Sequence, residues 1–505
     1  MTRLRSTGAT SVFALFLSTT ALCADVTPEQ VWESWQKQYA TFGFEVAPGS
    51  VAREGDTLAI RNLVFTSEVP VGEGLAAQTS TTTLTVPALL LKDQGDGTVK
   101  ASVDGEIDGT NVVTSTTGAP ETAQIRIDKS AATAVVSGTP EALSYLVDAP
   151  AVSVNVTATQ AGGSGDAIPS ALTIVLSGLA GTQQVTADTA GQQIHTDLKA
   201  SGMTMHLEGA NPEDGGPVKA DMVLSNLTVL GDNMVPAGAD NSDLGSALAR
   251  GLRSDMKMGF GGATFTMDAA PKEGPVNISG TAQAGQMQIS LAQEAFRYAV
   301  NGNGTTVSVK TAQLPMPVSA QIDRSEIDLA MPLAATATPQ PMTARLVLDG
   351  LSVSEQIWAM FDPKGHLAHG PATLVIDLSG KMRTLLDLFS PEAAKSPVPP
   401  IELDSVDINK LQLTLAGADL SGQGALSFDN SAGTPKPIGA IDLQLSGANK
   451  LMDGLVAMGM MPQDQVMFAK MMMGVYAVPK GEDLLTSKIE FKDGGKIFAN
   501  GQPIQ

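Results

Sequence analysis

The sequence predicts a mainly β, β-rich α+β protein, in which a long twisted antiparallel sheet can curl into a groove and carries a few short helices at its ends. Apolar and polar residues alternate through most of residues 45–350, as in residues 152–156 (VSVNV) and 287–291 (MQISL). A period of two is typical of strands with one packed and one solvated face. Clusters of Gly, Asn and Asp, such as residues 93–97 and 301–304, separate these runs and predict hairpin turns.

Residues 1–24 have the pattern of a signal peptide. Arg3 and Arg5 precede an apolar run at residues 12–17, and small residues lead into Cys23 and Ala24. The run is too short to span a membrane, so we expect cleavage after Cys23 or Ala24 and export to the periplasm. Later apolar windows are broken by charges, and we expect no transmembrane span after cleavage.

Residues 25–44 are expected to form an N-terminal amphipathic helix. Thr27, Pro28 and Gln30 provide a capping residue, a helix-starting proline and a side chain that reaches back to the cap. Trp32, Trp35 and Tyr39 then fall on one face. This aromatic anchor either clamps the helix onto a sheet end or forms a platform on which a ligand stacks.

The helix is followed by an extended antiparallel β region at residues 45–389. Short helices are expected within it at residues 242–252, 354–361 and 382–389. A Pro-rich linker at residues 390–400 is the best internal boundary. Residues 401–505 form a C-terminal β region that contains a Met-rich helical hairpin.

The helical hairpin is the main candidate for an exposed apolar surface in the sequence. It starts near Lys450 and is divided at Pro462. Methionine fills irregular gaps in cores and also makes adaptable binding surfaces, so the hairpin either packs over the sheet end or touches a lipid or a partner. The residues of this expected surface are Met452, Met458, Met461, Met467, Met471 and Met472.

The charge of the chain excludes one large class of function. There are 31 Lys and Arg against 52 Asp and Glu, which gives a formal net charge of −21. Proteins that bind nucleic acids neutralise phosphates with clustered basic residues. We therefore expect no nucleic acid partner.

The sequence has no recognisable catalytic or metal-binding pattern. It contains a single cysteine and no Gly-x-Ser-x-Gly turn. His195 and His206 lie in alternating segments, which predicts solvated side chains on a polar sheet face. His366 and His369, with Asp362, have metal-like spacing, but neighbouring Pro and Gly residues prevent the helix that such pairs use. We therefore name no catalytic, cofactor-binding or metal-binding residue and expect no cofactor.

Three stretches resemble a known family. They are residues 351–380, which include IW, FDP and PATLVIDLSG, residues 445–449 (LSGAN) and residues 498–502 (FANGQ). They are similar to the uncharacterised exported family of Gram-negative bacteria called domain of unknown function 2125. The resemblance implies a periplasmic, strand-rich protein over most of the mature chain, and it supplies no catalytic residues.

These observations favour a non-catalytic periplasmic protein that binds an apolar or lipid ligand or an envelope partner. The first alternative is a structural or assembly factor that acts through exposed sheet edges. The second is a hydrolase, which would depend on the four histidines. The sequence does not determine the ligand, the partner or the oligomeric state.

Overall fold

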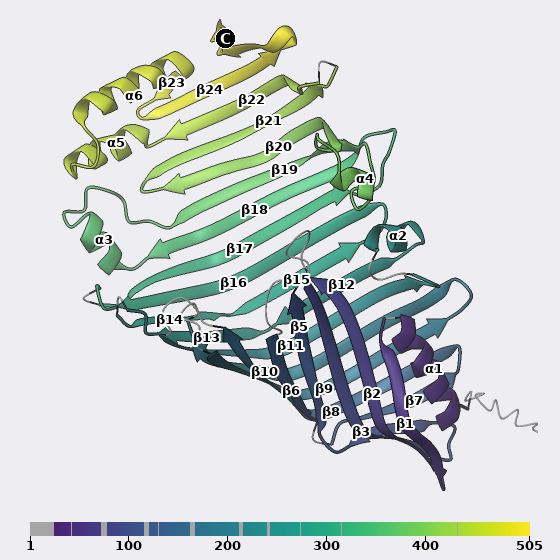
Figure 1. Ribbon diagram of the computed structural model, residues 1–505. Coiled ribbons are helices and arrows are strands. Elements are labelled where there is room, and N and C mark those ends of the chain that lie inside the picture. The colour runs from purple at the N-terminus through teal and green to yellow at the C-terminus, as the bar shows by residue number, and fades with distance from the viewer. Residues whose placement is uncertain are drawn as a thin grey trace, which may run out of the picture.

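The structure, a computed structural model, consists of one antiparallel sheet with a few short helices (Figure 1). It describes residues 25–504 apart from residues 42, 72–77, 116–120, 130, 162–166, 212–215, 240–242, 273, 315 and 432. Strands account for 66% of the chain and helices for 12%, which confirms the predicted fold class. The predicted signal peptide, with Cys23 and Ala24, lies outside the described residues.

The sheet follows the order of the chain closely: most strands pair with the strand that precedes or follows them, and the remaining pairs join strands two or three places apart. Short turns suffice for such connections because neighbouring strands are antiparallel. The strands are β1 (Glu45–Glu54), β2 (Thr57–Val71), β3 (Gln78–Asp93), β4 (Val99–Asp104), β5 (Ile107–Ser115), β6 (Glu121–Asp128), β7 (Thr133–Thr139), β8 (Ala142–Ala161), β9 (Ala167–Ala187), β10 (Gly191–Ala210), β11 (Pro217–Pro236), β12 (Arg253–Phe260), β13 (Gly262–Ala269), β14 (Val276–Ala282), β15 (Ala284–Leu291), β16 (Ala295–Thr311), β17 (Val318–Pro332), β18 (Gln340–Val353), β19 (Ala372–Thr384), β20 (Ile401–Leu415), β21 (Ala418–Asp429), β22 (Lys436–Ser446), β23 (Val478–Gly481), β24 (Leu484–Lys492), β25 (Lys496–Ala499) and β26 (Gln502–Pro503).

A line of backbone irregularities crosses the sheet from β1 to β18. Some long strands are interrupted there, so that β4 and β5 together pair with β3, and β12 and β13 together pair with β11. Several residues along this line have a positive φ, a conformation that Gly and Asn adopt most readily. These residues are Asn62 (φ 48°), Gly105 (φ 82°), Gly178 (φ 59°), Asn226 (φ 51°), Gly304 (φ 57°) and Gly350 (φ 68°). We call this feature the kink line.

The kink line changes the rhythm of the alternation. On β11 the less exposed side chains are those of residues 218, 220, 222 and 224 before Asn226, and those of residues 227 and 229 after it. A single residue in the left-handed conformation exchanges the two faces of the strand. The apolar side chains therefore stay on one face, although they are even-numbered before this residue and odd-numbered after it.

Most of the sheet is a single layer. The accessible surface is 28938 Å², whereas a compact monomer of 52.0 kDa would expose about 17,000 Å². No second sheet covers the faces of β16 to β22 in Figure 1. This open architecture agrees with the low aromatic content, because a thick core would need large side chains.

The sheet curls only at its N-terminal end. In Figure 1 the strands β1, β2, β3 and β7 pass in front of the later strands, and helix α1 (Pro28–Thr41) closes the side of the curl. The largest cluster of buried apolar side chains lies here, and it includes Ile60, Leu91, Val99 and Val136, which are completely buried. The hydrophobic core of the protein therefore lies inside this N-terminal curl.

Helix α1 begins as its sequence predicts. The Thr27 amide donates to Gln30 Oε1 over 2.9 Å, and the Gln30 amide donates to Thr27 Oγ1 over 3.3 Å, which forms a reciprocal capping box. The guanidinium of Arg53 on β1 donates to both carboxylate oxygens of Glu29 over 3.0 and 3.1 Å. These contacts fix the start of α1 against the edge of the curl.

The remaining helices lie at the ends of strands (Figure 1). They are α2 (Leu244–Ala249), α3 (Glu355–Phe361), α4 (Pro391–Ala394), α5 (Ala448–Ala457), α6 (Gln463–Tyr476) and the short 3-10 helix η2 (Asp493–Gly495). The helices expected at residues 242–252 and 354–361 are present as α2 and α3. The helix expected at residues 382–389 is wrong, because residues 382–384 extend β19 and pair with residues 401–403 of β20. The same pairing carries the sheet across the Pro-rich segment at residues 390–400.

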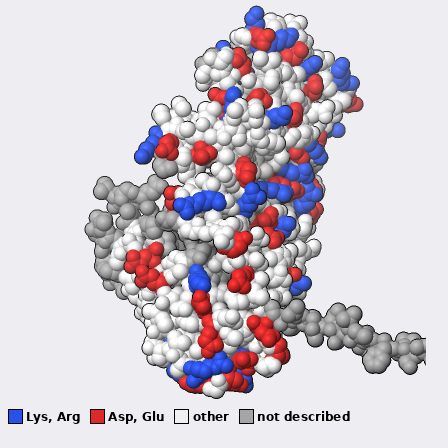
Figure 2. Space-filling view, turned by 90° about the vertical axis from the view of Figure 1, so that its right-hand side faces the viewer, with Lys and Arg blue, Asp and Glu red and all other residues white. Residues whose placement is uncertain are grey.

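Acidic and basic groups are interspersed on the side of the molecule seen in Figure 2. On the polar face of the sheet they form ion pairs across neighbouring strands. Arg297 Nη2 lies 2.7 Å from Asp328 Oδ2, and Arg345 Nη1 lies 2.5 Å from Asp377 Oδ2. Cross-strand pairs of opposite charge stabilise a solvated sheet face modestly.

Candidate apolar binding site

The apolar face of the sheet contains a row of side chains that runs from β2 to β22 without a polar residue. Each member pairs directly with the next across neighbouring strands, and the Cβ atoms of adjacent members other than glycine are about 4.5–5.5 Å apart. The row consists of Leu58, Leu91, Ala101, Ala134, Val147, Gly181, Leu198, Val229, Met258, Met287, Val300, Ile327, Leu346, Ile376, Leu411, Gly422 and Leu443. We call it the apolar ladder.

A second row beside the apolar ladder consists only of leucines. It lies on the same face in the C-terminal part of the sheet. Its members are Leu348, Leu374, Leu413, Leu420, Leu445 and Leu485. The apolar face of this part is therefore several residues wide.

The apolar ladder is fully covered at one end and is partly buried or exposed along the rest. Leu58 and Leu91 in the curl are 4% and 0% exposed, whereas Met258 and Ile327 are 39% and 40% exposed. Monomeric proteins rarely leave large contiguous apolar surfaces in water unless they bind something there. The apolar ladder thus links the core of the curl to an uncovered face.

A cavity of about 440 Å³ lies inside the curl, on the apolar face. Its volume is within the range of small-molecule sites. Val86 and Leu89 line it from opposite sides of the kink line, as do Val103 and Ile107. The cavity is therefore located where the kink line crosses the curled end. Its other lining residues are Trp35, Tyr39, Phe44, Leu63, Phe65, Leu84, Ala101, Ser102, Ile127, Lys129, Ala132, Thr133, Ala134, Val147 and Ala149.

The three aromatic residues expected on α1 have different surroundings. Trp32 is only 7% exposed and belongs to the core, whereas Trp35 and Tyr39 line the cavity. Trp35 Nε1 donates to the Tyr145 hydroxyl over 3.0 Å, and the two rings stack with their centroids 6.3 Å apart. The Tyr39 ring meets Phe65 edge to face at 5.0 Å. The helix is thus clamped onto the sheet and also contributes two rings to the cavity wall.

Both tyrosines at this place are neutral over the physiological pH range. Burial raises the pKa of Tyr145 to about 12, against a smaller lowering by the Trp35 hydrogen bond. Burial likewise raises the pKa of Tyr39. The wall therefore carries no negative charge from these phenols.

The Met-rich hairpin lies far from this cavity, at the C-terminal end of the sheet (Figure 1). Met467 and Met471 on α6 are 68% and 59% exposed, and Phe468 between them is 60% exposed. Met452, Met458, Met461 and Met472 are half-buried. The hairpin is thus an exposed apolar surface, and its expected role in contacting a lipid or a partner stays a prediction.

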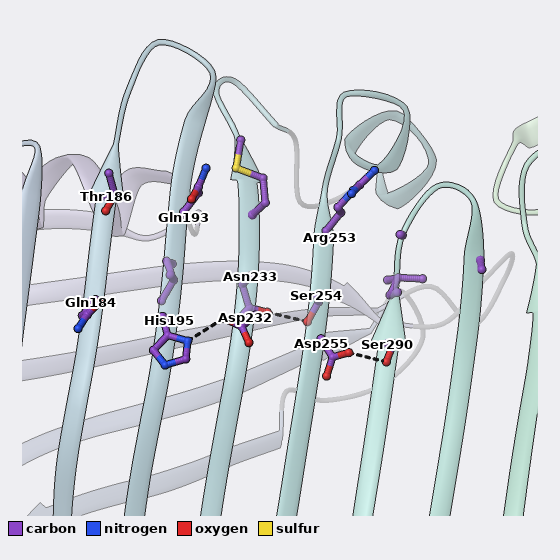
Figure 3. A pocket seen from close by; sticks show the side chains of 15 residues that line it. Gln184, Thr186, Gln193, His195, Asp232, Asn233, Arg253, Ser254, Asp255 and Ser290 are labelled. Atoms are coloured by element: carbon purple, nitrogen blue, oxygen red, sulfur yellow. Dashed lines mark hydrogen bonds and ion pairs between the residues drawn. The ribbon is translucent and has the colours of Figure 1, made fainter.

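A larger hollow of about 600 Å³ involves the polar face of β9 to β12 and β15 (Figure 3). His195 Nδ1 and Asp232 Oδ1 are 2.6 Å apart, but these side chains are 51% and 76% exposed. Ser290 donates to Asp255 over 3.0 Å rather than to the imidazole. A serine hydrolase would need a hydroxyl that donates to His195 Nε2, and none does so among the described residues. We therefore regard the apolar cavity as the stronger candidate site.

The residues with metal-like spacing form a structural loop instead. The Asp362 side chain is buried and accepts hydrogen bonds from the amides of His366 and Leu367, over 2.9 and 2.7 Å. Burial alone would raise the pKa of Asp362, but these donors together with His369 lower it. His369 stacks on Trp358 with centroids 4.2 Å apart. In the described part of the chain, no group of three or more His, Cys, Asp and Glu side chains could hold a metal ion.

His206 on the polar face should make stability depend on pH. Its Nδ1 lies 2.6 Å from Asp221 Oδ1, and this hydrogen bond raises the pKa of His206. The stabilisation is complete below the unfolded pKa of about 6.5 and is lost as the pH rises through the folded pKa. His206→Gln should therefore lower the melting temperature more at about pH 5.5 than at about pH 8. Asp221→Asn should have the same dependence, and equal losses at both pH values would contradict this assignment.

The fold and the cavity define the protein as a one-layer antiparallel sheet protein with a continuous apolar face. Residues 261–499 match the family described as an uncharacterized protein conserved in bacteria, DUF2125. The matched residues are 239 of the 505, and the matched family is the one that the sequence resembles. No curated protein and no solved structure matches the chain. None of the described helices is long and apolar enough to cross a membrane.

Most of the cavity could not be predicted from the sequence. Val103, Gly105 and Ile107 follow a continuous strand rhythm in the sequence, yet the strand breaks at Gly105. Pro87 lies across from this break, and a Cβ on Gly105 would approach Pro87 Cγ to 3.0 Å. A proline inside one strand and a glycine inside the next are sequence signals of a kink at this place. Lys129 gave no comparable signal.

Proposed function

We propose that this protein is an exported, periplasmic binding protein for apolar ligands, such as lipids or their acyl chains. One observation carries the proposal: a row of residues without a polar member crosses the sheet, is exposed at Met258 and Ile327, and forms part of the wall of a cavity at its N-terminal end. Ala101, Ala134 and Val147 belong both to the apolar ladder and to the cavity wall. The expected signal peptide supports the location.

The one-layer sheet suits this function physically. Covering the exposed apolar face with a ligand would remove it from water at a gain of about 25 cal/mol per Å². A second protein layer would provide the same gain without a ligand, but the C-terminal strands have none. Binding an apolar chain is therefore a direct way to stabilise this face.

Strand addition at a sheet edge, the first alternative, has less support. Among the described residues β1 pairs with β2 and with no strand on its other side. However, β1 contains Pro48, which has no amide hydrogen, and it is charged near its end at Arg53 and Glu54. Natural edge strands use proline and charges to discourage pairing with other chains.

The proposal is tested with the purified, exported protein. Native mass spectrometry should detect bound apolar molecules, and a fluorescent acyl probe should bind saturably and be displaced by fatty acids and fatty alcohols. If no apolar molecule accompanies the protein and no probe binds, the proposal is wrong. If a protein partner copurifies in fixed stoichiometry instead, the edge-pairing alternative gains support.

A further inference from the structure

We infer that the cavity in the N-terminal curl takes a single-chain amphiphile with an anionic head, and that Lys129 holds this head. The inference rests on the proposed function and adds the ligand class. The head is a carboxylate or a phosphate monoester, because both offer oxygens to an ammonium group. The apolar wall holds the chain.

Lys129 is the only cationic side chain among the described residues that line the cavity, and none of them is acidic. It is half-buried. The carboxylates of Glu106 and Asp108 pair with Arg126, and no ion pair of Lys129 occurs in the described part of the chain. A half-buried ammonium at an apolar wall, without an acidic partner in the described part of the chain, attracts an anionic group because water screens its charge only partly there.

The backbone holds Lys129 at this place. It follows the last residue of β6, and the Ala132 amide donates to its carbonyl over 3.0 Å, which closes the turn into β7. Its amine donates to the Gly105 carbonyl on the kink line. An ammonium has three N–H groups, so two remain for the oxygens of a ligand head.

The chain of the ligand would lie along the rest of the wall. Leu63, Val86 and Ile127 contribute aliphatic groups, and Trp35 and Phe65 contribute rings. A pocket that is apolar apart from one or two polar groups fixes the orientation of its ligand through those groups. In this cavity Lys129 would fix the head and leave the chain in contact with the apolar wall.

The test compares three probes of similar chain length: palmitic acid, hexadecanol and a lysophosphatidic acid. We expect the protein to bind at least one of the two anionic probes about tenfold more tightly than the alcohol. Lys129→Met should remove this preference and leave the affinity for hexadecanol unchanged. Lys129→Arg should retain most of it. Lys100→Met removes an exposed lysine of β4 and serves as the control for net charge.

The outcomes separate this inference from the proposed function. If none of the probes binds, the proposed function fails. If hexadecanol binds as well as both anionic probes, or if Lys100→Met has the same effect as Lys129→Met, only the assignment of Lys129 is overturned. A preference for palmitic acid alone identifies a carboxylate head, and a preference for lysophosphatidic acid alone identifies a phosphate head. Melting temperatures of both Lys129 variants show whether the turn is intact.

Discussion

Leu91→Ala should lower the free energy of unfolding of the N-terminal curl by about 2–5 kcal/mol. Leu91 is a member of the apolar ladder on β3, and its side chain is completely buried. Removing its branched end leaves a void between the layers of the curl, which the packed neighbours fill only in part. Chemical denaturation followed by tryptophan fluorescence measures the effect, because Trp32 and Trp35 both lie in α1.

The matched control is Leu413→Ala in the open part of the sheet. Leu413 lies on the same apolar face, in the leucine row, and is 41% exposed. Less apolar surface is buried there and no second layer would enclose a void, so the loss should stay below about 1 kcal/mol. Equal losses for the two variants would contradict a core confined to the curl. They would indicate that the apolar face of β20 is also covered.

Ala134→Phe should weaken the binding of an acyl ligand at least about tenfold, which corresponds to about 1.4 kcal/mol. Ala134 on β7 belongs to the apolar ladder and lines the cavity, where a phenyl ring would occupy the space of the chain. An aromatic ring of suitable size in an apolar cavity need not destabilise the fold, although overpacking would cost about 1–3 kcal/mol. Titration with a fluorescent acyl probe measures affinity, and thermal unfolding measures stability.

Ala299→Phe is the control for this substitution. Ala299 lies on the polar face of β16, where it pairs with Gln288 and Asp328. A ring at that position should leave acyl binding unchanged. If Ala299→Phe weakens binding as much as Ala134→Phe, or if neither variant does, the cavity is not the acyl site.

The stability loss expected for Leu91→Ala and the binding loss expected for Ala134→Phe both depend on the enclosure of the apolar ladder in the curl. The apolar ladder crosses regions in which the same residue type has different surroundings, and only the curl encloses it. Binding should therefore begin where the wall is already formed. The exposed part of the ladder then provides a surface along which a longer apolar ligand could extend.

Several local elements could be predicted because their determinants are close together in the chain. The capping box of α1 needs only Thr27 and Gln30, and both hydrogen bonds are present. The helix expected at residues 382–389 is absent because apolar spacing indicates a helix only where no strand pairs with the segment. Met382 and Thr384 pair with Leu403 and Ile401, and this pairing across the Pro-rich segment decided their conformation.

His195 and His206 also show which features depend on local sequence and which depend on pairing between strands. Alternation placed His195 and His206 on a solvated face, and their side chains are 51% and 45% exposed. Their acidic partners, Asp232 and Asp221, come from the neighbouring strand β11. Because register depends on the hairpin as a whole, these pairs do not follow from the alternation of one strand.

The sequence alone determined that this protein is a long antiparallel sheet with one apolar face, because a period of two acts within each strand and requires no distant contact. It also located α1 and the Met-rich hairpin. Only the tertiary structure decided where that face is covered, since the curl depends on the summed twist of many strands and on kinks at Gly105 and Asn226. The cavity and the position of Lys129 in its wall follow from that curvature, which no single segment specifies.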